Sequence, residues 1–321
     1  MNKNILLLKF LFLFFIIIIV FYLANKYYLK KNMINYENFE NINVNIGNYL
    51  VVYFYLMGKS FLRGNDFNYN LKDVKFIKDL PSFVPLNKDI ENQFIEYNFT
   101  LDELYNEEKK IILVAMWTII NERREQFWLI MKPQINQILD EALIKNNLNT
   151  NIDYPVIHFR CSDTPFIRNG FYFFQKYKFF KDSLEEIKKM KNINYDKVIL
   201  LSCNSHKSND KNSDSCNIYA NSLQDYLENL GYEVIIKCES NLEDFATMFY
   251  APAVISTCSS FSFIAGFFSN GIFISEGHYD CNNDKIKCDS CDNWLKNGYS
   301  IPHNEIDDYY NTDLVIQKLY D

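Results

Sequence analysis

Blocks of hydrophobic and polar positions alternate along the second half of the chain, and they predict strands followed by helices. Short apolar runs of strand length fall at 155–160, 197–202, 232–237, 253–257 and 271–275. Segments with helical spacing lie between them, at 175–191, 217–230, 242–250 and 260–268. Alternation of this kind is the pattern of a parallel, doubly wound α/β sheet with helices on both of its faces.

The segment from Val44 to about Arg63 predicts a strand, a turn and a helix. The strand is short, the turn falls at Gly47 and Asn48, and the helical spacing begins after Leu50. A strand-turn-helix step lets backbone N–H groups face a ligand in a cleft, although most Gly-Asn pairs are ordinary turns.

The remaining segments show weaker periodicity. Residues 64–100 predict loops and short strands, whereas apolar stripes at 101–124 and 133–145 predict two helices. The polar stretch 146–153 is the predicted domain boundary, and 307–320 predicts a final amphipathic helix.

The amino terminus carries a long apolar run. Ile5–Ala24 is interrupted only by Lys9, and about 20 apolar residues match one bilayer crossing. A membrane anchor is favoured over a cleaved signal peptide, because the apolar region is long and its end does not resemble a cleavage site. Lysines on the two sides of the run nearly balance, so the charge rule leaves its orientation open.

Composition limits the class of protein. The chain has 321 residues, of which 48% are hydrophobic, and this is enough for a globular protein of one large or two modest domains. Its net charge of -7 argues against a general nucleic-acid binder, because such proteins hold phosphates with surplus Lys and Arg. Any site for a polyanion must therefore be local.

Seven of the eight cysteines form two groups. Four lie in or beside apolar runs of strand length, namely Cys161, Cys203, Cys238 and Cys258. A cysteine in such a run is most often a small buried hydrophobe, although an oxidising compartment would favour disulfides. A later cluster contains His278, Cys281, Cys288 and Cys291, and either a loop disulfide or a zinc site fits it, with the disulfide favoured.

Asn98-Phe-Thr100 is the only N-glycosylation sequon of the chain, and it gives weak support to a lumenal location.

Polar residues follow three of the predicted strands. The first strand ends in His158, Arg160 and Asp163, the second in Ser202 and Asn204, and a later one in Thr257, Ser259 and Ser260. Parallel strands place these ends at one edge of the sheet, where open α/β sheets bind ligands. The guanidinium of Arg160 suits a diphosphate, and serines at a helix start suit a phosphate. A structural ion pair between Arg160 and Asp163, and simple helix capping by the serines, are the alternatives.

Three segments in order resemble the GDP-fucose-dependent fucosyltransferases, most closely the α-1,2 type. In chain order they are "IGNYL", "HFRCSD" and "LEDFATMFYAPAVISTCSSFSFIAGFFSNG". The resemblance covers mainly residues 155–275, together with the segment at Gly47 and Asn48. It implies a GT-B fold, in which two Rossmann-like domains face a cleft, and an inverting transfer that needs no metal or other cofactor.

The resemblance also implies roles for individual residues. Arg160 would hold the β-phosphate of the donor, with His158 beside it. Thr257, Ser259 and Ser260 would form the phosphate loop, and Asp244 would take the acidic position of the third segment. Gly47 and Asn48 would face the donor from the first domain, and Ser202 and Asn204 are candidates for the ribose or base. Cys161 stands where the family often has a second basic residue.

The general base stays open among three candidates. Asp163, Glu276 and His278 could each deprotonate an acceptor hydroxyl, and we expect Arg160 and Asp163 to be the catalytic residues.

These observations predict four parts: an anchor and stem start at 1–32, an acceptor-side α/β domain at 33–150, a donor domain at 151–300 and a final helix at 301–321. The predicted protein is a single-pass type II membrane glycoprotein with a lumenal domain, as in the Golgi or endoplasmic reticulum. We expect it to transfer fucose from GDP-fucose to a glycan or glycoprotein acceptor, with no nucleic-acid partner. A transferase of another nucleotide sugar and an inactive glycan-binding or scaffold protein are the alternatives.

Overall fold

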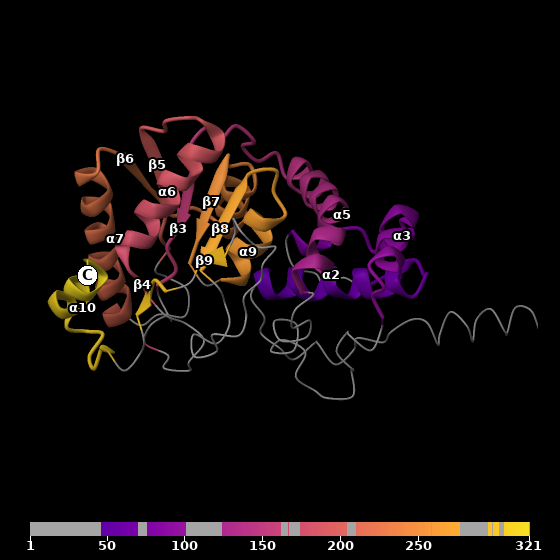
Figure 1. The fold of residues 1–321 in the computed structure, drawn as a ribbon, viewed down its shortest axis with the longest axis horizontal. Helices are drawn as coiled ribbons and strands as arrows, with labels where there is room; N and C mark the ends of the chain where they lie inside the picture. Colours follow the sequence, from indigo (N-terminus) through magenta and orange to yellow (C-terminus); the bar gives the residue numbers. More distant parts are fainter. Residues whose placement is uncertain are drawn as a thin grey trace, which may run out of the picture. The chain divides into compact units, whose positions relative to one another are not determined.

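The structure is a computed structural model of the chain (Figure 1). It describes residues 46–69, 76–100, 124–161, 166, 174–203, 210–257, 259–276, 295–296, 298–301 and 305–320. The chain divides into two units, Met1–Asn43 and Val44–Asp321, and every described residue belongs to the second. The predicted anchor, the predicted helix at 101–124 and the cluster from His278 to Cys291 therefore lie outside the described residues. No helix in the described part is long and apolar enough to cross a membrane.

A parallel sheet dominates this unit, in the spatial order β6-β5-β3-β7-β8-β9. Its strands are β3 (Val156–His158), β5 (Lys197–Leu201), β6 (Glu233–Lys237), β7 (Ala253–Ser256), β8 (Ile272–Glu276) and β9 (Leu295–Lys296). Numbered along the chain, the order is 3-2-1-4-5-6, which is that of the Rossmann sheet. The winding direction reverses between β3 and β7, so the gap beyond their carboxyl ends is the topological switch point.

Helices follow the strands and cover both faces of the sheet (Figure 1). They are α6 (Tyr177–Lys191), α7 (Asp210–Asn229), α8 (Asn241–Phe249), α9 (Ser260–Phe267) and α10 (Thr312–Tyr320). Side chains alternate between the faces of a strand. Ile157 and Ile255 accordingly join the core under α6, α7 and α10, whereas Phe273 meets Phe263 of α9 on the other face. A short antiparallel pair, β4 (Phe174–Gln175) with β10 (Ser300–Ile301), lies outside this sheet.

The strand-helix alternation predicted from the sequence is confirmed in the second half of the chain. The two-residue strands β4, β9 and β10 were not predicted. Among the predicted elements the largest difference is the start of α7, at Asp210 rather than near 217. The polar segment 210–216 lacks the apolar spacing that marks the rest of the helix. The predicted domain boundary at 146–153 is a turn followed by residues without regular secondary structure, within the compact unit. The division into domains stays a prediction.

The residues before 146 are mainly helical where the structure describes them. They form α2 (Ile46–Leu62), α3 (Lys88–Glu96), α5 (Arg124–Lys145), the short helix η2 (Ile77–Asp79) and the two-residue strands β1 (Phe67–Asn68) and β2 (Phe83–Val84).

The turn predicted at Gly47 and Asn48 is wrong, because both residues lie in the first turn of α2. This helix is buried on nearly all sides, so it has no polar face from which a sequence pattern could locate its start. Its predicted end near Arg63 is confirmed.

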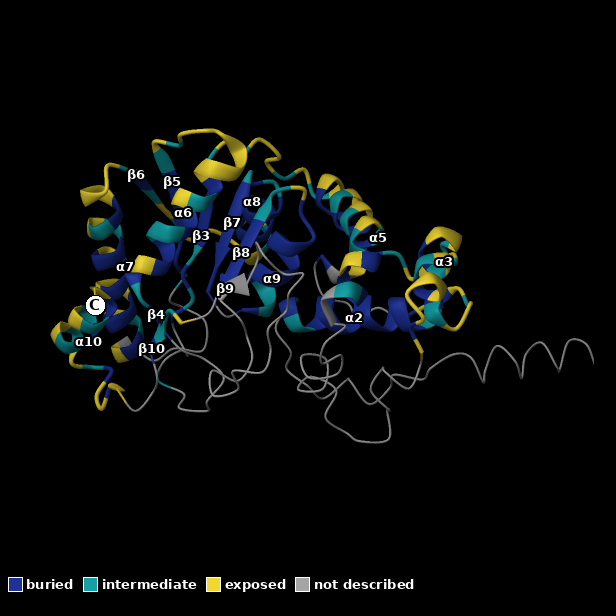
Figure 2. Cartoon of the chain, in the orientation of Figure 1, coloured by how far each residue is buried: buried dark blue, intermediate teal, exposed yellow. Residues whose placement is uncertain are grey.

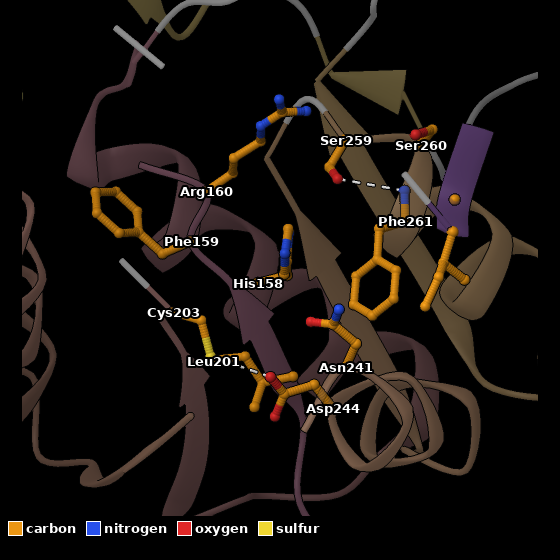
Figure 3. A pocket seen from close by; sticks show the side chains of 12 residues that line it. His158, Phe159, Arg160, Leu201, Cys203, Asn241, Asp244, Ser259, Ser260 and Phe261 are labelled. Carbon is orange, nitrogen blue, oxygen red and sulfur yellow. Dashed lines mark hydrogen bonds between the residues drawn. The ribbon is translucent and has the colours of Figure 1, made fainter. Parts of the chain in front are cut away.

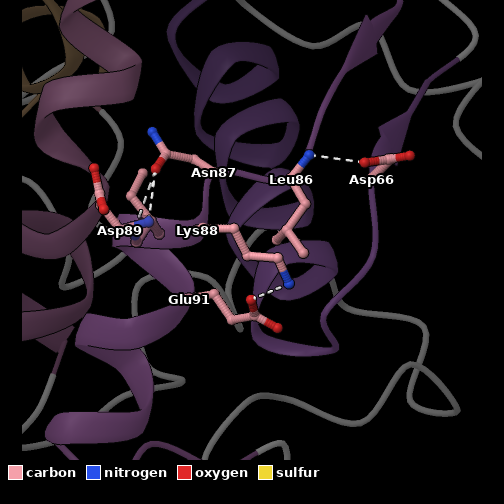
Figure 4. A network of polar contacts seen from close by, with 7 residues as sticks. Asp66, Leu86, Asn87, Lys88, Asp89 and Glu91 are labelled. Atoms are coloured by element: carbon pink, nitrogen blue, oxygen red, sulfur yellow. Dashed lines mark hydrogen bonds and ion pairs between the residues drawn. The ribbon is translucent and has the colours of Figure 1, made fainter.

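Helix α3 was not predicted within the loops expected at 64–100. The side chain of Asn87 caps its start by accepting hydrogen bonds from the backbone N–H groups of Asp89 and Ile90 (Figure 4). Only Ile90 and Phe94 are buried in this short helix. Two apolar positions are too few to establish a helical period in the sequence.

Helix α5 begins at Arg124, so the predicted start at Pro133 is also wrong. Proline favours the first turn of a helix because its ring removes an N–H that the interior needs. Here Pro133 lies inside the helix, and the buried side chains of Phe127, Trp128 and Met131 hold the turns before it. Tertiary packing thus overrides the local preference.

Two disulfides correct the expectation that the strand cysteines are simple hydrophobes. Cys161, just beyond β3, is bonded to Cys216 of α7, and Cys203, just beyond β5, is bonded to Cys238, just beyond β6. Cys258 lies outside the described residues. Both disulfides lie at the carboxyl edge of the sheet. The sequence pattern placed Cys161, Cys203 and Cys238 in or beside strands, but it did not single out Cys216 or reveal which cysteines meet.

We expect the Cys161–Cys216 bond to stabilise the fold. The two cysteines are 55 residues apart, and closing a loop of that size removes entropy from the unfolded chain. The double variant Cys161→Ala/Cys216→Ala should lower the free energy of unfolding by about 2–4 kcal/mol, measured by urea denaturation. Equal stability of the variant and the oxidised wild-type protein would contradict this role.

Candidate functional site

A pocket opens at the switch point of the sheet (Figure 3). It opens to solvent, and its empty space is about 810 Å³ when the open mouth is included. Its lining comes from the ends of β3 and β5 and from the starts of α2, α8 and α9. The lining residues are Ile46, Gly47, His158, Phe159, Arg160, Leu201, Cys203, Asn241, Asp244, Ser259, Ser260 and Phe261.

Thr257 sets the position of Arg160. Its hydroxyl donates a hydrogen bond to the backbone oxygen of His158 (2.9 Å) and accepts one from the backbone N–H of Arg160 (2.8 Å). The side chain therefore spans β3 and β7 where the two strands separate. Arg160 extends from this fixed backbone into the pocket, toward the side on which Ser259 lies (Figure 3).

The amino end of α9 forms the wall opposite β3. Ser259 caps the helix, and its hydroxyl accepts a hydrogen bond from the backbone N–H of Phe261 (3.3 Å). Ser256 and Ser262 are buried behind the cap, with their hydroxyl oxygens 2.6 Å apart. A helix amino end carries partial positive charge, so this wall and Arg160 both favour an anion.

Helix α2 meets α9 at Gly47. A Cβ atom at this position would lie 2.4 Å from the backbone nitrogen of Phe261 and 2.8 Å from the carbonyl carbon of Ser260. Only glycine permits this approach of two backbones. Ile46 and Gly47 thereby bring the start of α2 to the pocket, beside the start of α9.

His158 is held neutral in the floor of the pocket. Burial lowers its pKa to about 3, and the charge of Arg160 adds to the shift. Its Nδ1 atom is buried and has no hydrogen-bond partner among the described residues. The ring of Phe261 lies 6.1 Å away, centroid to centroid. At neutral pH this imidazole can exchange hydrogen bonds with a ligand but adds no charge.

Asp244 is buried at the opposite side of the pocket from α9 and Arg160 (Figure 3). One carboxyl oxygen accepts a hydrogen bond from the backbone N–H of Glu239 (3.1 Å), and the other lies 3.1 Å from the sulfur of Cys203. Burial raises the pKa of Asp244; the backbone hydrogen bond from Glu239 opposes this shift, and the charges of Glu239 and Glu243 add to it. The carboxyl group thus binds the segment before α8 and contacts the disulfide between Cys203 and Cys238.

The pocket brings together six of the residues that the sequence proposed: Gly47, His158, Arg160, Asp244, Ser259 and Ser260. Thr257 is buried behind the pocket, and neither Ser202 nor Asn48 lines it. Asp163, Asn204 and His278 lie outside the described residues, and Glu276 is the last residue of β8. The donor-binding and catalytic roles of all these residues stay predictions.

Sequence reasoning missed Asn241 and Phe261, which also line the pocket. Asn241 follows Ser240, which begins α8 with a capping box to Glu243. That box was a usable signal, because it places the next residue at the carboxyl edge of the sheet. Phe261 follows Ser259 and Ser260, and the sequence pattern did not distinguish it from the other apolar residues of α9.

The described residues contain no group of three or more His, Cys, Asp or Glu side chains that could hold a metal ion. The chemistry available in the described pocket is anion binding by Arg160 and helix amino ends, with hydrogen bonding by His158, Asn241 and the serines.

The fold and the pocket define an α/β protein with a Rossmann-like parallel sheet and an anion-suited site at its switch point. Comparison with known proteins adds no relative: no family model matches the chain, and no curated protein or solved structure has detectable similarity to it.

We expect His158 to make the protein less stable in mild acid. Its pKa is near the ordinary value of about 6.5 when unfolded and about 3 when folded, so the unfolded state binds the proton first as pH falls. Stability from this group is complete above pH 6.5 and is lost as pH falls toward 3. Between pH 7.5 and 5 the loss is about 2 kcal/mol. In urea denaturation over this pH range, the free energy of unfolding of His158→Gln should fall by about 2 kcal/mol less than that of the wild-type protein. Equal losses in the two proteins would show that His158 does not cause the effect.

We expect Gly47→Ala to be destabilising, although alanine ordinarily favours a helix over glycine by about 1 kcal/mol. The new methyl group would meet the backbone of α9, so the helices must separate at a cost of about 1–3 kcal/mol. Thermal unfolding measures the effect. Asn48→Ala, at the half-buried neighbouring position, is the matched control and should change stability by less than about 1 kcal/mol. A stabilising Gly47→Ala would disprove the close approach.

Proposed function

We propose that the protein is a glycosyltransferase that binds a nucleoside diphosphate sugar at the switch-point pocket, with GDP-fucose as its donor. One observation carries the proposal: Arg160 and the amino end of α9 line the same pocket. Both groups bind phosphate oxygens well, and the switch point is where Rossmann sheets bind nucleotides. The choice of fucose rests on the resemblance of residues 155–275 to the fucosyltransferases.

The proposed reaction is an inverting transfer to a glycan hydroxyl. The bond between the sugar and the diphosphate breaks as the acceptor oxygen attacks, so negative charge grows on the departing phosphate. Arg160 and the start of α9 would stabilise that charge more in the transition state than in the bound donor. The partial positive charge at the start of α2 would add to this effect.

His158 is poorly suited to deprotonate the acceptor, because a pKa of about 3 makes it a weak base at neutral pH. Its proposed role is hydrogen bonding to the donor. Asp163, Glu276 and His278 remain the candidates for the general base.

The proposed architecture is GT-B-like, with the residues before 146 on the acceptor side of the cleft. The contribution of Ile46 and Gly47 to the pocket supports this arrangement. We further propose that Ile5–Ala24 anchors the protein as a type II membrane protein with this unit in an oxidising lumen. The two disulfides favour such a compartment, because cytosolic thiols are kept reduced.

We expect GDP to bind the wild-type protein in a calorimetric titration, and Arg160→Ala to weaken that binding about ten- to a hundred-fold, since hydrogen bonds to charged groups contribute about 1.5–3 kcal/mol. Arg160→Lys keeps the charge but loses the planar fork, so its affinity should be intermediate. Arg63→Ala removes an exposed arginine just past the far end of α2 and is the matched control, with affinity unchanged.

The same titration separates the alternatives. Tighter binding of UDP or CMP than of GDP would replace the proposed donor by another nucleotide sugar. Absence of binding to any nucleotide at millimolar concentration would favour an inactive glycan-binding protein. Binding of GDP without transfer of fucose to any of a range of acceptors would retain the site and refute the reaction.

A further inference from the structure

The sequon Asn98-Phe-Thr100 lies at the carboxyl end of α3, where its geometry is well defined. The backbone N–H of Asn98 donates to the oxygen of Ile95, and that of Phe99 donates to the oxygen of Phe94, both at 2.9 Å. Asn98 itself has the left-handed backbone conformation, with φ of 51°. This pair of bonds around a left-handed residue is the Schellman motif that ends many helices.

The motif directs the three sequon residues differently. Phe99 is buried, and its ring packs against that of Phe94 at 5.6 Å between centroids, which is the apolar contact that accompanies a Schellman turn. Asn98 and Thr100, on either side of it, are exposed. The acceptor and the hydroxyl residue of the sequon thus face solvent while the residue between them anchors the turn.

The start of α3 is fixed as well. Asn87 caps its first turn (Figure 4) and also donates a side-chain hydrogen bond to Gln134 of α5 (3.0 Å). The helix that carries the sequon is therefore held at both ends. The exposed surface beside the sequon includes two apolar side chains, Ile95 at 65% exposure and Tyr97 at 45%. Figure 2 shows exposed residues, coloured yellow, in α3.

We propose that Asn98 carries an N-linked glycan, which covers Ile95 and Tyr97. In this step Asn98 Nδ2 bonds to the anomeric carbon of a lipid-linked diphosphate oligosaccharide. The bond from that carbon to the diphosphate breaks, and the lipid diphosphate leaves with the proton from Nδ2. The inference rests on the lumenal location in the proposed function, which the two disulfides support independently, and not on sugar transfer by this protein.

The glycan and the pocket are well separated. The pocket includes the first residues of α2, whereas Phe99, next to Asn98, packs against Phe127, which lies against Gly58 near the other end of that helix. Gly58 is 11 residues from Gly47, about 16 Å along the helix at 1.5 Å per residue. A glycan on Asn98 therefore leaves the pocket open, and its absence should leave GDP affinity unchanged.

The test is expression of the full chain in cultured animal cells, followed by electrophoresis with and without peptide-N-glycosidase. The wild-type protein should show one enzyme-sensitive mobility shift. Asn98→Gln and Thr100→Ala should lose the shift, whereas Thr100→Ser, which preserves the sequon, should keep it. Thr100→Ala leaves Asn98 in its turn, so its loss of the shift cannot be attributed to a disrupted helix end.

A matched control comes from the end of α6. Asn192 is exposed and has a left-handed conformation with φ of 52°, and Asn194→Thr creates a sequon there. A second shift in Asn194→Thr together with one at Asn98 supports the proposal. A shift at Asn192 alone would refute glycosylation of Asn98, and no shift at either site would refute it together with the lumenal location. GDP titration of Thr100→Ala tests the nucleotide site separately, so failure of one proposal is distinguishable from failure of the other.

Discussion

The side chain of Thr257 links the ends of β3 and β7 at the pocket, and the rest of the site depends on this link. At the switch point β3 and β7 must diverge, and backbone groups at their ends lose the partners that a continuous ladder would supply. The backbone N–H of Thr257 still donates to the oxygen of His158 (3.2 Å), and the hydroxyl of Thr257 adds a second hydrogen bond to that oxygen while it accepts one from the N–H of Arg160. The strands can therefore separate without leaving the N–H of Arg160 unpaired, and the backbone of Arg160 is fixed where its side chain enters the pocket.

A second constraint comes from outside the sheet. The start of α2 can reach the pocket because Gly47 allows its backbone to lie against that of Ser260 and Phe261. The rest of α2 is buried among aromatic side chains, including Phe54 against Phe268 and Tyr55 against Phe127. This packing restricts the position of α2, so the amino ends of α2 and α9 are held by the core and need no ligand to bring them together.

The parallel sheet and the pocket residues His158, Arg160, Ser259 and Ser260 could be predicted because strand ends in such a sheet must meet at one edge. Gly47 and Asp244 were proposed from the resemblance to the fucosyltransferases, and both line the pocket. The sequence could not predict what depends on contacts between distant segments. Gly47 resembled a turn residue because nothing local reveals α9 beside it, and the partner of Cys161 lies 55 residues away. Helix α3 was not predicted because its capping residue, Asn87, is of a type that is equally common in loops. Contacts of this kind can be identified only from the tertiary structure.

The lining of the pocket also resolves the conflict between the acidic net charge of the protein and the anionic ligand proposed for it. The net charge of -7 repels an anion at a distance, but salt screens exposed charges beyond about 8–10 Å. Inside the pocket, the ordinarily charged side chains of the lining are Arg160 and Asp244. Burial raises the pKa of Asp244 and so weakens its preference for the charged form, while Arg160 keeps its charge. The local electrostatic potential therefore favours an anion near Arg160 and the amino end of α9, even though the net charge of the protein is negative.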